Sequence, residues 1–389
     1  MIGARLKQAR LLAGMTQRQL ARELGEAGFK ITAAAISKYE KEKSFPTARF
    51  WLTASNVLDV PSTYFSHQPV KRVEWLAFRC RSRLSKRERD RIKAYASDVA
   101  ELQFELAELL FPNANPKMRV IPVKTLADAE DAAVQLRNDW DVGDRPLDNL
   151  AQTAEDRGIA VIAWHDETGY FDGLSGRCNE RPVAVVNTNV PLDRFRLSLA
   201  HEIGHLVMDV VDAAEADAEE LAYRFAASLL VPAEHAYREL GRNRPHIGWG
   251  ELMSLKRKYG MSMAAWLMRA RDLQIVTQNN HLDMWKDFGS RGWRRDEPEK
   301  YVGDEEPLQL NQMAQRAVAE GLIGPDRITR VAIDILDDEN ELIRDGEYPT
   351  AGELLEMSQD ERDMWMEKMF ELAETLDFEV FEAFGEEEF

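Results

Sequence analysis

The sequence predicts an α+β protein that is mostly helical. Apolar residues recur at helical spacing along most of the 389-residue chain, and capping or breaking residues bound these stretches. Only residues 158–189 change to three apolar, β-branched runs separated by turns, the pattern of a small three-stranded sheet. A chain of this length suggests two to four domains. The order of patterns along it divides it into five regions, covering residues 1–66, 67–115, 116–245, 246–300 and 301–389.

Residues 1–66 predict five short helices. Residues 2–13 carry a helical apolar stripe that ends at Gly14, and Thr16 is a good N-cap for a second helix. The starts of the remaining helices are marked by Thr32, by Pro46 with Thr47, and by Pro61. Short helices with a tight turn between them describe a helix-turn-helix domain.

A helix-turn-helix domain binds DNA by placing its third helix in the major groove while the second crosses the phosphate backbone. The residues that we expect on or near the base-reading surface are Thr32, Ala33, Ala34, Ser37 and Lys38. Those that we expect at the phosphate backbone are Gln17, at a helix N-terminus, and the cations Arg18, Lys41 and Lys43. The two alanines offer no hydrogen-bonding group, so modest sequence specificity is expected. A protein-interaction role for this domain is the alternative.

The net charge of −18 conceals a strong asymmetry. Residues 1–93 hold 20 Lys/Arg and 8 Asp/Glu, or +12, whereas the other 296 residues hold 30 and 60, or −30. We therefore expect the front part to meet a polyanion, double-stranded DNA in particular.

Much of the positive charge falls in residues 67–115, which we expect to form a basic helical connector. Eight of its ten cations are candidates for a contact: Arg79, Arg81, Arg83, Lys86, Arg87, Arg89, Arg91 and Lys93. They could extend the contact with DNA phosphates, or they could form a solvated helix face or a strip docked on the acidic end of the chain.

Helices are expected on both sides of the sheet in residues 116–300. Residues 125–140 and 147–158 precede the strands, and Pro191 starts the helix that follows them. Further helical stretches follow at 217–232, 233–240, 249–260 and 262–273. The acidic region 301–389 is also expected to be helical, because aromatic residues and methionines are interleaved with its charges.

The helix after the sheet contains HEIGH, residues 201–205. Two histidines four apart lie one above the other on a helix, so His201 and His205 can bind one Zn²⁺. Glu202, between them, is placed to act as the general base of a peptidase. A metal motif that follows a small sheet predicts a zincin-like domain.

A catalytic zinc takes three protein ligands, so a third ligand is needed from a neighbouring helix. The stretch 217–232 is the best source, because its alanines would let it approach the motif helix closely. Glu219 is our candidate, and Glu220, about 100° away around the helix, is its rival.

Two further roles have open candidates. Tyr223, His235 and His246 could each stabilise the oxyanion that forms during hydrolysis, and the sequence does not choose among them. Asp172 or another carboxylate could orient a zinc-bound histidine.

Several motifs occur in an order that resembles the ImmA/IrrE metallopeptidases: FDGLSG, PVAVVNTN, LSLAHEIGHLVM and EELAYRFAASLLVP, within roughly residues 120–300. The resemblance implies that His201, His205 and Glu219 bind zinc and that Glu202 is the base. The front domain is similar to the XRE group, the Cro-type helix-turn-helix, through LKQARLLAGMTQRQLARELG, ITAAAISKYEKEKSFPT and LTASNVLDVPSTYF. Members of the metallopeptidase family act on DNA-binding repressors, which implies a regulatory endopeptidase.

The sequence therefore predicts a zinc metalloendopeptidase, fused to a DNA-binding domain, that cleaves a repressor, an antitoxin or another regulator. The rival is a transcription regulator or antitoxin-like protein without proteolytic activity, in which the zinc site is structural or sensory. A homodimer is compatible with either function. We expect a cytoplasmic protein without signal peptide or membrane span, because the start lacks an apolar core and Cys80 and Cys178 fit neither a disulfide framework nor metal spacing.

Overall fold

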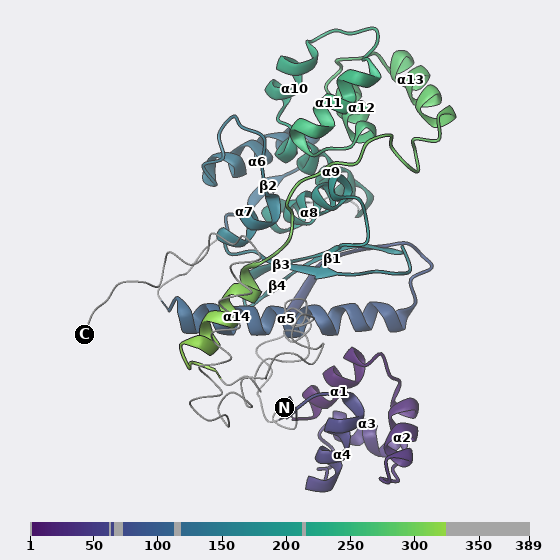
Figure 1. Ribbon diagram of the computed structural model, residues 1–389, viewed down its shortest axis with the longest axis vertical. Helices are drawn as coiled ribbons and strands as arrows, with labels where there is room; N and C mark the ends of the chain where they lie inside the picture. The colour runs from purple at the N-terminus through teal and green to yellow at the C-terminus, as the bar shows by residue number, and fades with distance from the viewer. Residues whose placement is uncertain (1, 62–63, 66–72, 113–117, 212–214, 324–389) are drawn as a thin grey trace, which may run out of the picture. The chain divides into compact units, whose positions relative to one another are not determined.

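The computed structural model describes residues 2–61, 64–65, 73–112, 118–211 and 215–323. Within these ranges the predicted class, α+β and mostly α, is confirmed (Figure 1). The predicted acidic region is described only up to residue 323, and the rest of it lies outside the described residues.

The front domain contains the helices α1 (Ile2–Leu12), α2 (Gln17–Glu26), α3 (Ala33–Glu40) and α4 (Ala48–Leu58), followed by a helical turn at Tyr64–Phe65. Threonine hydroxyls cap three of these helices: Thr16 accepts from the Gln19 amide, Thr32 from Ala35 and Thr47 from Phe50. The helices bury one core, which includes Leu6, Leu20, Leu24, Ile36 and Phe50. Local capping thus fixes where each helix starts, and the apolar stripe fixes which face is buried.

The main sheet has four strands in the order β1-β4-β5-β3: β1 (Val73–Cys80), β4 (Phe171–Cys178), β5 (Arg181–Asn187) and β3 (Ala160–Trp164). Strands β1 and β4 and strands β4 and β5 are antiparallel, whereas β3 and β5 are parallel. The three expected strands are β3, β4 and β5. The prediction of a helical connector was wrong for residues 73–80, because these residues extend the sheet by pairing Val73 with Cys178 and Phe78 with Leu174.

Helices cover both faces of this sheet (Figure 1). The long helix α5 (Lys86–Leu110) packs on β3 and β4, and α8 (Leu192–Val207) packs on β4 and β5 from the other side. A second, two-stranded parallel sheet joins β2 (Ile121–Val123) to β6 (Met208–Val210), directly after α8. The motif helix is therefore held between the main sheet and the helices that follow.

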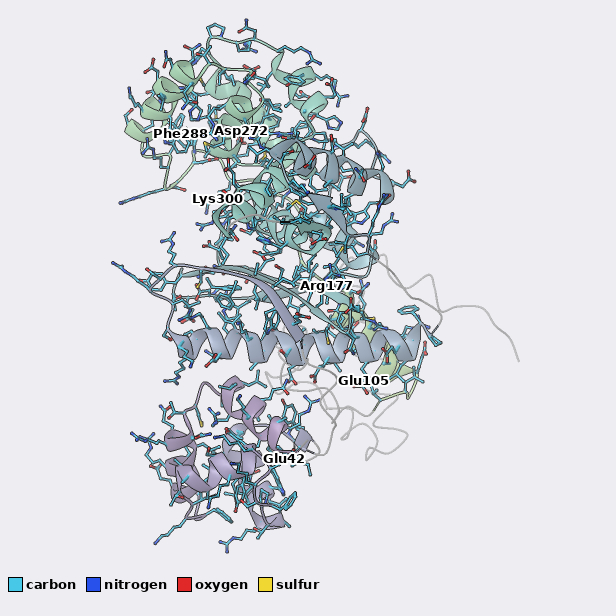
Figure 2. All side chains as sticks on the ribbon, turned by 180° about the vertical axis from the view of Figure 1, so that it is seen from behind. Glu42, Glu105, Arg177, Asp272, Phe288 and Lys300 are labelled. Carbon is cyan, nitrogen blue, oxygen red and sulfur yellow. The ribbon has the colours of Figure 1, made fainter. Side chains whose placement is uncertain are left out.

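One hydrophobic core joins α8 to its helical neighbours. These are α6 (Leu126–Asp139), α7 (Leu150–Asp156), α9 (Glu215–Leu230), α10 (Ala233–Leu240), α11 (Trp249–Tyr259), α12 (Met263–Asp272) and α13 (Gln278–Ser290). Phe288, labelled in Figure 2, illustrates this continuity, because it is fully buried and its ring contacts those of Trp249, Trp285 and Trp293.

Residues after 300 return across the molecule to α14 (Gln309–Ala319), which packs on α5. Glu305 is buried in an ion pair with Arg196 of the motif helix, and its second oxygen accepts the backbone amides of Leu150 and Ala151 at the start of α7. Among the described residues, no helix is both long enough and apolar enough to cross a membrane.

The front domain is joined to α5 by buried polar contacts. The Arg5 guanidinium lies 2.8 Å from a Glu101 oxygen and 3.3 Å from Asp98, and the Tyr64 hydroxyl donates to Asp98. Burial outweighs the attraction of Arg5 and raises the pKa of Glu101 to about 7 and that of Asp98 to about 6.

Candidate active site

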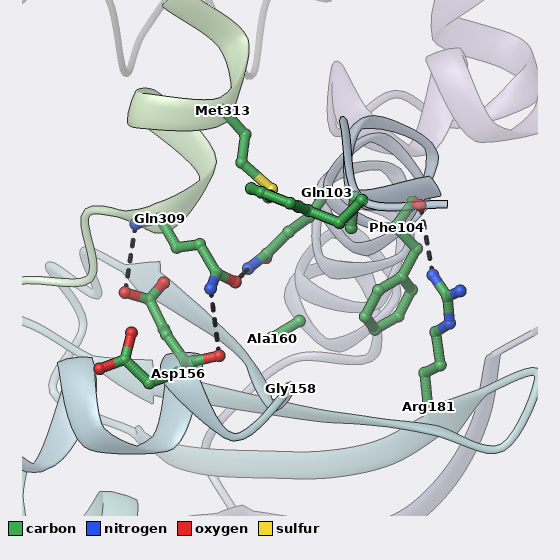
Figure 3. Close-up of a pocket in the computed structure, with 11 residues that line it drawn as sticks. Gln103, Phe104, Asp156, Gly158, Ala160, Arg181, Gln309 and Met313 are labelled. Atoms are coloured by element: carbon green, nitrogen blue, oxygen red, sulfur yellow. Dashed lines mark hydrogen bonds between the residues drawn. The ribbon is translucent and has the colours of Figure 1, made fainter. Parts of the chain in front are cut away.

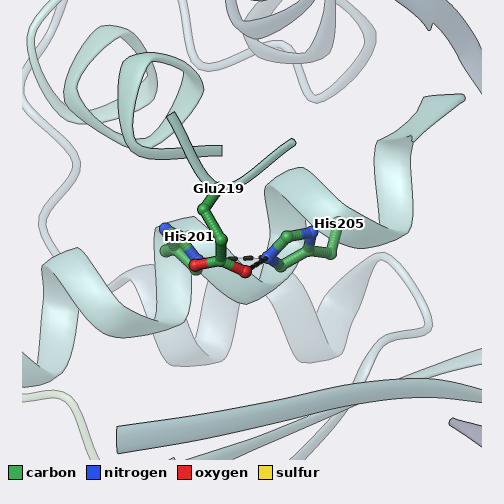
Figure 4. A group of neighbouring side chains, drawn as sticks. All are labelled: His201, His205 and Glu219. Carbon is green, nitrogen blue, oxygen red and sulfur yellow. Dashed lines mark hydrogen bonds and ion pairs between the residues drawn. The ribbon is translucent and has the colours of Figure 1, made fainter. Parts of the chain in front are cut away.

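His201, His205 and Glu219 converge on one point between α8 and α9 (Figure 4). The Nε2 atoms of the two histidines are 3.1 Å apart. One Glu219 oxygen lies 3.3 Å from the His201 Nε2, and the other lies 3.2 Å from the His205 Nε2. Three side chains from two helices thus bring one ligand atom each to within 4.8 Å of one another.

Close packing of α8 against α9 brings Glu219 to the histidines. Ala222, Phe225 and Ala226 of α9 are fully buried, and the Phe225 ring lies over Gly204 of the motif. A Cβ atom on Gly204 would stand only 3.0 Å from the Phe225 ring, so glycine is what permits the two helices to approach. Glu220, the rival, is exposed.

The surroundings favour a neutral His201 and an ionised Glu219. Burial lowers the pKa of His201 to about 4, so its ring is neutral at pH 7 and can offer a nitrogen lone pair. Hydrogen bonds to His201 and His205 hold the pKa of Glu219 far below its usual range.

This donor set fits a zinc ion. Two imidazole nitrogens with one carboxylate oxygen are a recurrent set of ligands at catalytic zinc sites. A tetrahedral zinc with ligands at about 2.1 Å separates the ligand atoms by roughly 3.4 Å, and the two imidazole Nε2 atoms lie 3.1 Å apart.

Glu202 points from α8 toward the sheet. Its side chain is fully buried, and neither carboxylate oxygen has a hydrogen-bonding partner among the described residues. Gly173 of β4 makes room for it, since a Cβ atom at this position would stand 2.8 Å from the Glu202 carboxyl carbon. Burial raises the pKa of Glu202 to about 7, which suits a group that must take and release a proton near neutral pH.

Sequence reasoning missed Arg79 as a residue of this site. Arg79 lies on β1, and its guanidinium donates to the Ser198 hydroxyl at 2.9 Å and to the Tyr223 hydroxyl at 3.1 Å. Its charge adds to the effect of burial in lowering the pKa of His201, and it partly opposes the rise that burial causes in the pKa of Glu202. No motif marks this residue, because only the pairing of β1 with β4 carries it to the peptidase region.

Of the three candidates for stabilising the oxyanion, only Tyr223 lies beside the converging histidines. Tyr223 lies at the site, with its ring 4.4 Å from that of His201 between centroids. His235 instead contacts Asp144 and Tyr259, and His246 packs on Trp249.

Asp172 binds Arg194 at 2.6 Å and lies 3.9 Å from Arg79, so both of these contacts are with arginines rather than with a histidine. The His201 Nδ1 atom is buried and has no hydrogen-bonding partner in the part of the chain that the structure describes.

The predicted DNA-contacting residues lie on or beside α2 and α3. Six of them have exposed side chains: Arg18, Thr32, Ala34, Lys38, Lys41 and Lys43. Ala33 and Ser37 are half-buried. The Gln17 amide already donates to Glu40 at 2.7 Å, and Glu40 also pairs with Arg10, so this glutamine is tied within the domain.

Two parts of the chain match models of known families. Residues 6–65 match the family model described as Helix-turn-helix, and residues 154–271 match the model described as IrrE N-terminal-like domain. The resemblance to a Cro-type DNA-binding domain fused to an ImmA/IrrE-type domain is thereby confirmed. No curated protein matches the chain.

Proposed function

We propose that this fusion is a DNA-binding zinc endopeptidase that cleaves a regulatory protein, such as a repressor or an antitoxin-like partner. The observation that carries the proposal is the arrangement on α8 and α9. Three metal-binding side chains meet within 4.8 Å, and a fully buried carboxylate lies beside them on the motif helix.

His201, His205 and Glu219 would hold the zinc ion. When bound, zinc supplies Lewis acidity, which lowers the pKa of a water toward ~7 and polarises the scissile carbonyl. Glu202 would then take a proton from the attacking water and pass it to the leaving amine. The Glu202 carboxylate occupies the space against β4 that a side chain at Gly173 would fill.

Arg79 and Tyr223 would stabilise the oxyanion. The two side chains are hydrogen-bonded to each other, and the Tyr223 ring lies tilted against that of His201, with the ring centroids 4.4 Å apart. Fixed donors at the point where negative charge develops contribute more than mobile ones. We therefore select Tyr223 over His235 and His246.

The front domain would bring the peptidase to DNA. Its exposed Arg18, Lys38, Lys41 and Lys43 would contact phosphates or bases, and the exposed cations of residues 81–89 would add to the phosphate contacts. A regulator bound at the same promoter would then be presented to the peptidase site. DNA binding also agrees with the expected cytoplasmic location, and a homodimer remains part of the proposal.

The first substrates to test are DNA-binding regulators, beginning with any that the genes beside this one encode. Zinc-loaded wild type and Glu202→Gln, at equal zinc content, are incubated with the purified regulator. We expect one discrete cleavage by the wild type and none by the variant. A regulator that stays intact with wild type, combined with zinc-dependent DNA binding, would favour the rival, a sensory regulator.

A further inference from the structure

A pocket of about 440 Å³ lies where α5, α7 and α14 meet the sheet (Figure 3). Its volume falls within the range of roughly 300–1,000 Å³ of small-ligand sites. Phe104 and Met313 provide apolar walls, and Gln103, Glu155, Arg181 and Gln309 provide polar ones. None of the three converging metal-binding side chains lines this pocket.

Two hydrogen-bond acceptors at the pocket have no donor among the described residues. Gln103 donates to the Gln309 side-chain oxygen at 3.0 Å, and Gln309 donates to the Glu155 carbonyl at 3.1 Å. One Glu155 carboxylate oxygen accepts the backbone amides of Leu308 and Gln309. The other Glu155 oxygen, and the Gln103 oxygen, are buried without a hydrogen-bonding partner among the described residues.

Both of these acceptors belong to buried side chains. Gln103 is 2% exposed and Glu155 is 3% exposed. Buried polar groups normally have partners, so these two acceptors are the groups of the pocket that the N–H donors of an incoming molecule would satisfy.

The cation of the pocket is already engaged. Arg181 donates to the Phe104 carbonyl at 3.2 Å, pairs with Glu108 at 3.1 Å and lies over the Phe104 ring. Asp156 adds a further carboxylate to the lining. The pocket therefore offers acceptors and an aromatic surface to an incoming molecule.

We propose that this pocket is a binding site for a small molecule with a flat apolar body and N–H donors, that is, an aromatic amine, amidine or amide. The body packs between Phe104 and Met313, and the donors reach Gln103 and Glu155. The walls contributed by α5 and α14 lie outside residues 154–271, which match the family model.

The test is a calorimetric titration of the full-length protein with two compounds. Benzamidine carries N–H donors on an aromatic ring, and benzoate has the same ring without any N–H donor. Ala107 lines the pocket on α5, so Ala107→Trp should fill it. Leu109→Trp, at an exposed position of the same helix, is the matched control.

We expect saturable binding of benzamidine, with benzoate at least tenfold weaker. Ala107→Trp should weaken benzamidine binding at least tenfold, and Leu109→Trp should change it less than twofold. If Ala107→Trp does not fold, as judged by circular dichroism, Met313→Trp fills the pocket from the opposite wall. The proposal is overturned if benzamidine does not saturate, if the filling variant binds it as well as wild type, or if benzoate binds equally and is blocked by the same variant.

Discussion

Replacing Glu219 by glutamine isolates the third ligand of the proposed zinc site. The substitution keeps the shape of the side chain but removes the charge that faces both histidine Nε2 atoms, at 3.3 and 3.2 Å. Changing a group that only orients a ligand typically costs 10- to 100-fold in metal affinity, so losing a direct ligand should cost about 100-fold or more. This corresponds to about 2.7 kcal/mol of zinc-binding free energy.

Glu220→Gln is the matched control, because it makes the same charge change one residue away on an exposed side chain. The assay is competition for zinc against a fluorescent chelator, with each protein at the same concentration and ionic strength. Glu220→Gln should weaken zinc binding by less than about threefold, since exposed charges are screened. Equal losses for the two variants, or full affinity in Glu219→Gln, would refute the assignment.

Three other predictions concern the space around Glu202, the buried Glu101 and the exposed cations at the start of α5. Gly173→Ala places a Cβ atom 2.8 Å from the Glu202 carboxyl carbon and so displaces the carboxylate, which should lower kcat/KM about 100-fold at unchanged zinc content. The control is Gly250→Ala, whose new Cβ atom has no neighbour within 4 Å and should leave kcat/KM unchanged. Folding raises the pKa of Glu101 from 4.5 to about 7, so the folded protein binds this proton more tightly than the unfolded chain, and the free energy of unfolding falls as the pH rises from about 4.5 to 7. Glu101→Gln removes this titration, so urea unfolding should show that the stability of the variant relative to wild type is greater at pH 8 than at pH 5. A difference that does not change with pH would contradict this reasoning. Replacing Arg83, Lys86 and Arg89 by glutamine should reduce the slope of log K against log salt for DNA by roughly 2.7 if all three contact phosphate, and an unchanged slope would exclude these residues from the DNA contact.

Local signals in the sequence predicted the elements that carry chemistry. The caps at Thr16, Thr32 and Thr47 fixed the helices of the front domain, and the four-residue spacing of HEIGH fixed which helix face carries both imidazoles. The preference for Glu219 over Glu220 depended on helix rotation, together with the small residues that let α9 approach α8. Each of these signals lies within one or two turns of helix.

Features that depend on distant pairing could not be predicted in this way. Strand β1 forms because Val73 meets Cys178, about a hundred residues later, and that pairing delivers Arg79 to the peptidase site. The pocket between α5, α7 and α14 likewise combines Gln103, Glu155 and Gln309. Nothing in the spacing of these residues along the chain indicates that they meet.

The central claim is that the buried Glu202 and the three converging side chains hydrolyse peptide bonds. The most direct test incubates zinc-loaded wild type and Glu202→Gln, at equal zinc content, with a proteome-derived peptide library and identifies new N-termini by mass spectrometry. The account predicts a defined set of cleavages by the wild type that is absent with the variant. The same cleavages by both proteins, or none by either, would contradict it.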